Sequence, residues 1–155
     1  MTTPPDLPNR PILLIEDEAM DIDLTLQAFA QARVSNPVVI CRDGDVAKDF
    51  INAHTAAEDP QLPIVALLDL HLPKVDGLEV LRHARKQSPW KQIPFVIMTS
   101  SLDTLDITNA YELGANSYIV KPISFVAFAE VVTHIKAYWL LTNVPPFAHP
   151  VLRPL

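Results

Sequence analysis

The feature that most constrains the fold of this chain is a set of short, largely apolar runs that each end in polar residues. Four such runs stand at residues 12–15, 64–68, 95–98 and 117–120. Short runs of this kind are typical of strands buried on both faces of a parallel sheet. The polar groups that follow them in turn are Glu16 and Asp17, Asp69, Thr99, and Lys121. Ligands of open parallel α/β sheets bind at the carboxyl ends of the strands, so we expect these groups to meet at one site.

Helix-like segments alternate with the strand-like runs, which favours a parallel sheet with helices on both faces. The predicted strands are 11–15, 38–41, 64–69, 95–99 and 117–120. The predicted helices are 19–32, 44–53, 77–88, 105–113 and 125–141. We therefore predict an α/β fold of the doubly wound kind, with five βα units and a five-stranded sheet.

Composition indicates a single globular domain. The 155 residues are 49% hydrophobic and 19% charged, and a net charge of −6 disfavours generic binding to nucleic acid. The only cysteine, Cys41, suits a reducing compartment. No apolar signal core opens the chain, and no apolar run approaches the roughly 20 residues that span a bilayer. We expect a cytoplasmic protein without a membrane segment or a fused DNA-binding domain.

The acids at the strand ends predict a metal site. Glu16, Asp17 and Asp69 would repel one another strongly if they converged, and a divalent cation relieves that repulsion. Mg²⁺ takes oxygen ligands from one or two carboxylates, waters and phosphate. Alternatively, Glu16 and Asp17 cap the next helix at its positive end. For the pair alone the two interpretations are about equally strong, and Asp69 on a second strand favours the metal.

Asp69 can also act as a nucleophile. An aspartate can form an acyl phosphate, and the transferring group needs cations and hydrogen-bond donors around it. Lys121 and Thr99 supply them. The bond between Lys121 and Pro122 is either an ordinary trans turn or a cis bond that would hold the lysine inward.

The segments ILLIEDE, LLDLHLPKVDG, VIMTSS and GANSYIVKP, in that order, resemble the receiver domain of two-component response regulators. The resemblance covers residues 11–142, which leaves a segment 1–10 and a proline-rich extension 143–155. It implies a flavodoxin-like (βα)5 fold, a sensor histidine kinase as partner and Mg²⁺ as cofactor. We expect a single-domain phosphorelay protein without enzymatic turnover of other substrates.

The resemblance also implies roles for individual residues. Asp69 would be the phospho-acceptor, with Thr99 and Lys121 on the phosphoryl group and Thr99 and Tyr118 as the switch pair. The metal ligands would be Glu16, Asp17, Asp69 and the backbone carbonyl of His71. Glu16 stands where aspartate is commoner, and the histidine side chain at 71 is unusual. His71 and Ser101 would flank the path of a water that attacks the acyl phosphate.

The last helix is more apolar than a one-sided helix requires. Together with the proline-rich extension, it resembles small regulators that partner phytochrome-type histidine kinases. This resemblance implies a homodimer through 105–113, 117–120, the last helix and the extension. Two interpretations stay open, because the extension could instead fold back and cover the surplus residues Phe125, Tyr138, Leu140 and Leu141.

Two other functions compete. A phosphatase of the haloacid dehalogenase type also uses a strand-end aspartate, Mg²⁺ and a lysine, but it needs a second aspartate two positions on, where this chain has His71. A nucleotide-binding module needs a glycine-rich loop, and the three glycines, Gly44, Gly77 and Gly114, form none.

Overall fold

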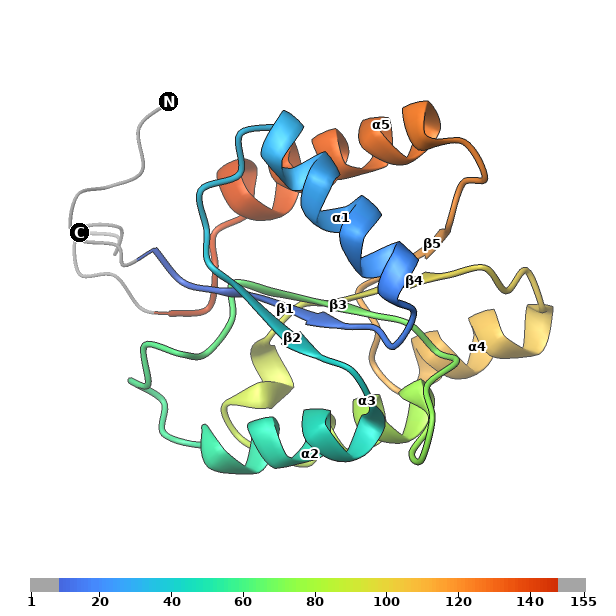
Figure 1. Cartoon of the computed structure of the whole chain (residues 1–155). Helices are drawn as coiled ribbons and strands as arrows, with labels where there is room; N and C mark the ends of the chain where they lie inside the picture. Colours follow the sequence, from blue (N-terminus) through green and yellow to red (C-terminus); the bar gives the residue numbers. More distant parts are fainter. Residues whose placement is uncertain (1–8, 148–155) are drawn as a thin grey trace.

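The computed structural model describes residues 9–147 and contains one five-stranded parallel sheet (Figure 1). The strands are β1 (Ile12–Ile15), β2 (Val38–Cys41), β3 (Val65–Leu68), β4 (Phe95–Thr99) and β5 (Ser117–Val120). Their order across the sheet is β2-β1-β3-β4-β5. The predicted doubly wound fold is confirmed, and β1, β3 and β4 lie in the interior of the sheet.

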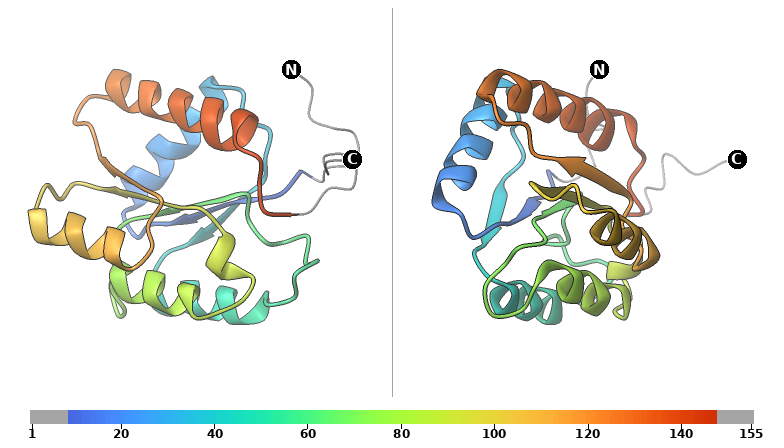
Figure 2. Two further views of the ribbon diagram at one scale, coloured as in Figure 1. Left: turned by 180° about the vertical axis from the view of Figure 1, so that it is seen from behind. Right: turned by 90° about the vertical axis from the view of Figure 1, so that its right-hand side faces the viewer.

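Two layers of helices enclose the sheet (Figure 2). The helices are α1 (Ala19–Gln31), α2 (Gly44–Ala53), α3 (Gly77–Arg85), α4 (Thr104–Glu112) and α5 (Phe125–Ile135). Helices α1 and α5 pack together on one face, and α2, α3 and α4 cover the other. Within 9–147, no helix is long and apolar enough to cross a membrane.

Alternation along the strands divides the core between the two faces. In β1, Ile12 and Leu14 face α1 and α5, whereas Leu13 and Ile15 face α2 and α3. All four side chains are at most 4% exposed. A strand buried on both faces must be apolar at every position, which is why these runs do not alternate.

Polar caps fix where the helices begin after each strand. Asp43, Asp76, Asp103 and Ser124 each accept a backbone N–H from the first turn of the helix that follows. Such caps satisfy donors that have no partner within the helix. They set the path of each loop at the carboxyl edge of the sheet.

The structure differs from the sequence prediction in several short segments. A 3₁₀ turn, η1 (Trp90–Gln92), was not predicted, and the last helix changes at its end into a π-helix, η2 (Lys136–Thr142). Phe125 and Leu140, predicted as surplus, pack against the core. Among the described residues the cis peptide bond is Ser88–Pro89, so Lys121–Pro122 is trans.

The described part of the C-terminal extension folds back onto the molecule. The ring of Phe147 lies 3.6 Å from the guanidinium carbon of Arg10, which precedes β1. This contact lies at the amino end of the sheet, opposite the edge where the predicted site residues gather. Residues 148–155 of the extension lie outside the described part.

Candidate functional site

The predicted site residues converge at the carboxyl edge of the sheet. The register pairs Ile15 with Leu68 and Leu68 with Ile97. Glu16 and Asp69 therefore leave adjacent strands side by side, and Thr99 lies one step beyond the residue opposite Asp69. Val120 pairs with Thr99, so Lys121 enters the same edge from β5.

Three acids form the cluster that the sequence predicted. One carboxylate oxygen each from Glu16, Asp17 and Asp69 lies within 4.8 Å of the others. Glu16 and Asp69 are buried, and Asp17 is more exposed. Burial raises the pKa of Glu16 to about 7, so its ionised form is unfavourable in the metal-free protein. A cation that neutralises the cluster would remove much of this cost.

Lys121 is the cation present in the chain itself. Its Nζ donates to Glu16 Oε1 at 2.5 Å and to Asp69 Oδ2 at 2.8 Å. Burial alone would lower the pKa of Lys121, but its hydrogen bonds to carboxylates raise it overall. The lysine therefore stays protonated and holds Glu16 and Asp69 together across two strands.

Asp69 is held by both of its oxygens. Oδ2 accepts from Lys121, and Oδ1 accepts the backbone N–H of His71 at 3.1 Å. Burial alone would raise the pKa of Asp69, but these hydrogen bonds lower it. Asp69 is thus an ionised carboxylate in a fixed orientation, the form required of a nucleophile.

The two predicted switch residues lie in different settings. Thr99 is fully buried, and its hydroxyl has no hydrogen-bond partner within 9–147. Tyr118 is half-buried, and its hydroxyl donates to the backbone carbonyl of Ser101 at 2.9 Å. Burial raises the pKa of Tyr118, so the phenol remains a donor. Tyr118 thereby ties β5 to the loop between β4 and α4.

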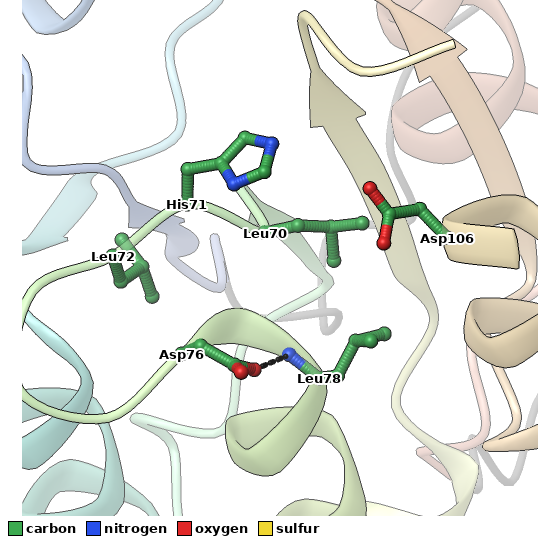
Figure 3. A pocket seen from close by; sticks show the side chains of 6 residues that line it. All are labelled: Leu70, His71, Leu72, Asp76, Leu78 and Asp106. Carbon is green, nitrogen blue, oxygen red and sulfur yellow. Dashed lines mark hydrogen bonds between the residues drawn. The ribbon is translucent and has the colours of Figure 1, made fainter. Parts of the chain in front are cut away.

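The loop after β3 borders a hollow of about 420 Å³ (Figure 3). His71 stands on one side and Asp106, from α4, on the other. Asp106 accepts a hydrogen bond from Ser101 Oγ at 2.6 Å. The side chain of His71 is exposed, and its backbone N–H donates to Asp69 Oδ1.

Asp21 is a site residue that the sequence reasoning missed. It lies in the first turn of α1, and its Oδ2 accepts from Lys121 Nζ at 2.8 Å. An acid in the first turn of a helix is common, so the sequence carried no signal that set Asp21 apart. Lys121 therefore has three carboxylate partners, Glu16, Asp21 and Asp69.

The donor set fits a hard divalent cation. Glu16, Asp17 and Asp69 offer only carboxylate oxygens, and backbone carbonyls of the nearby loop are of the same chemical type. The soft ligands that select zinc or copper do not contribute to this cluster. In this arrangement the acids can hold a cation on one side of Asp69 while Lys121 occupies the other.

Comparison with known proteins identifies the family of the chain. Residues 12–133 match the family model for the response regulator receiver domain. The chain is 38% identical over 135 residues to the probable methanogenesis regulatory protein FilR2 of Methanothrix harundinacea, with 87% of this chain and 86% of that protein covered. It is 34% identical over 141 residues to response regulator Rcp1 of Synechocystis, with 91% and 96% covered.

Solved structures share the fold over most of the chain. The phosphorylated cyanobacterial phytochrome response regulator RcpA superposes with a TM-score of 0.80 at 35% identity, covering 88% of this chain and 97% of that one. The Mn²⁺-bound form of Rcp1 superposes with a TM-score of 0.78 at 34% identity, covering 88% and 98%.

Proposed function

This chain belongs to the response regulator receiver family of two-component signalling proteins, and from that premise we propose that Asp69 accepts a phosphoryl group from a sensor histidine kinase. The observation that carries the proposal is the setting of Asp69. It is a buried, ionised carboxylate with Lys121 Nζ at 2.8 Å and two further acids within 4.8 Å. Phytochrome regulators among the relatives favour a kinase of the phytochrome type.

In the proposed transfer, a carboxylate oxygen of Asp69 attacks the phosphorus of a phosphohistidine. The new bond is an O–P bond, and the P–N bond to the histidine breaks. The electron pair leaves with the imidazole nitrogen, which takes up a proton. Lys121 would bond an oxygen of the transferred group, and Thr99 would turn its hydroxyl toward another. Their contribution is positioning and charge neutralisation.

We assign the divalent cation as Mg²⁺, held by Glu16, Asp17, Asp69 and the backbone carbonyl of His71. Bound there, Mg²⁺ would neutralise charge that develops on the phosphoryl oxygens. A site made of carboxylate ligands favours a hard divalent cation such as Mg²⁺. Glu16 would reach the site despite standing where aspartate is commoner.

Phosphorylation would be read out by the pair Thr99 and Tyr118. Engagement of the Thr99 hydroxyl would draw the β4–α4 loop inward and release Tyr118 from the Ser101 carbonyl. The surface of α4, β5 and α5 would then change its affinity for a partner, as a local charge event that biases a two-state element. We propose that this surface, with the extension at 143–155, forms a homodimer.

The remaining assignments follow from the same proposal. We place the receiver domain at 11–142, with a separate segment at 1–10 and the extension at 143–155. We further propose a cytoplasmic protein that does not bind nucleic acid. It would carry one phosphoryl group per chain and lose it by hydrolysis, without turning over other substrates as an enzyme.

The test is phosphorylation with Mg²⁺ and phosphoramidate, followed by intact mass spectrometry. Wild type should gain the mass of one phosphoryl group and Asp69→Asn none, because an amide cannot form the acyl phosphate. Asp76→Asn is the matched control: Asp76 lies on the same loop and caps α3, a role that asparagine also fills. It should gain the group as wild type does.

Two outcomes would overturn the proposal. One is a phosphoryl mass on Asp69→Asn, which would place the acceptor elsewhere. The other is sustained hydrolysis of a generic phosphate ester, which would favour the phosphatase interpretation over a signalling protein labelled once per chain.

A further inference from the structure

We infer that Asp21 is a positioning residue that holds Lys121 against Asp69 when a divalent cation occupies the acid cluster, an inference that rests on the metal site of the proposed function. Asp21 Oδ2 and Asp69 Oδ2 each accept from Lys121 Nζ at 2.8 Å. The ammonium is thus anchored from α1 as well as from the sheet.

The carboxylates that hold Lys121 differ in whether they also belong to the proposed metal site. Glu16 and Asp69 belong to the cluster whose oxygens lie within 4.8 Å of one another, and Asp21 does not. A cation bound by the cluster would draw charge from two of the three carboxylates that hold Lys121. It would also place a like charge near the ammonium. Asp21 alone would keep its full attraction for Lys121.

The setting of Asp21 makes this attraction effective. The side chain of Lys121 is 13% exposed and that of Asp21 is 32% exposed, so solvent only partly screens the pair. Asp21 lies on α1, a helix that is packed on the sheet and against α5. A carboxylate on a rigid element holds its partner more accurately than one on a loop.

The charge of the site gives the direction of the expected effect. Glu16, Asp17, Asp21 and Asp69 place four carboxyl groups around the single ammonium group of Lys121. Without the charge of Asp21, the site attracts a divalent cation less strongly. Lys121 also loses one of its three partners, so it competes more strongly with the cation for Glu16 and Asp69. Both effects weaken metal binding, by roughly three- to tenfold for a charge at this range.

The experiment titrates Mg²⁺ into the full chain by calorimetry and follows the Lys121 ammonium by ¹⁵N NMR, assigned with Lys121→Met. Asp21→Asn should bind Mg²⁺ roughly three- to tenfold more weakly than wild type. Its Lys121 resonance should broaden when Mg²⁺ saturates the site, whereas the wild-type resonance persists. Asp21→Glu should restore most of the affinity, because it returns the charge.

Asp23→Asn is the control, since Asp23 is exposed on the same helix and loses the same formal charge. Its affinity should stay within about twofold of wild type, as expected for a screened surface charge. If Asp21→Asn and Asp23→Asn behave alike, the positioning role is wrong. Failure of wild type to bind Mg²⁺ at all would instead contradict the metal site of the proposed function.

Discussion

The buried hydroxyl of Thr99 lowers the stability of the folded protein. Its hydroxyl is fully buried and unpaired among residues 9–147, although such a group is costly to desolvate. We predict that Thr99→Val raises the free energy of unfolding of the metal-free protein by about 1 kcal/mol, because valine fills the same space without a polar atom. Urea unfolding followed by circular dichroism measures the change.

Thr25→Val is the matched control, because Thr25 is equally buried but its hydroxyl donates to the Asp21 carbonyl at 2.7 Å. This variant should be no more stable than wild type. A Thr99→Val protein that unfolds at lower urea than wild type would show that the hydroxyl is satisfied after all.

The residues that the sequence could predict at the site share one property. Glu16, Asp69 and Lys121 each follow a strand directly and Thr99 is the last residue of β4, so the topology of the sheet alone brings them together. Asp21 lies inside a helix, where an acid in the first turn is ordinary. Its contact with Lys121 depends on the rotation of α1 about its axis, which only tertiary packing determines.

At the scale of the elements, Gly77 fixes how closely α3 approaches the site strand. A Cβ at this position would lie 2.6 Å from Leu70 Cα and closer still to the Asp69 carbonyl oxygen. We predict that Gly77→Ala costs about 1–3 kcal/mol of stability, although alanine is the better helix former. It should also slow phosphorylation, because the backbone of Asp69 must shift.

Urea unfolding and the mass-labelling rate check this prediction together. Glu79→Ala, two residues further along α3, removes only a half-exposed pair with Arg82 and should change stability by less than about 0.5 kcal/mol. Equal stability of Gly77→Ala and wild type would mean that the start of α3 can move without cost.

Strands and helices were predictable to different degrees. The short apolar runs located the interior strands β1, β3 and β4 because a strand buried on both faces has no polar positions, and similar runs marked the edge strands β2 and β5. The turn η1 could not be predicted because three residues carry no periodic signal, yet it buries Trp90, whose indole donates to the His54 carbonyl. The π-helix η2 preserves helical spacing at its start, so the sequence reads there as a continued α-helix.

The proposed dimer surface and the end of the last helix carry exposed apolar side chains. Among the described residues these include Leu105 and Tyr111 on α4, Val126 on α5, and Tyr138 and Leu141 on η2. Burial of such side chains against a second chain would stabilise a dimer. We predict that the full chain sediments as a dimer at tens of micromolar, and that Tyr138→Glu with Leu141→Glu makes it monomeric by placing charges in the contact.

Met20→Glu is the control, because Met20 is 70% exposed on α1, away from the proposed contact. It should leave the sedimentation coefficient unchanged. A wild-type monomer, with and without phosphorylation, would remove the dimer from the proposed function and leave the phospho-acceptor role untouched.

The hydrogen bonds of Lys121 also bear on how the molecule is made. They reach back 105 residues to Glu16, 100 to Asp21 and 52 to Asp69. Closing such long loops is entropically costly, and it follows the formation of local structure. During synthesis, the acids would therefore emerge long before their cation and remain mutually repelled until β5 docks. The receiver would become able to accept a phosphoryl group only when β5 completes the sheet and brings in Lys121. A partly synthesised chain would therefore not be phosphorylated.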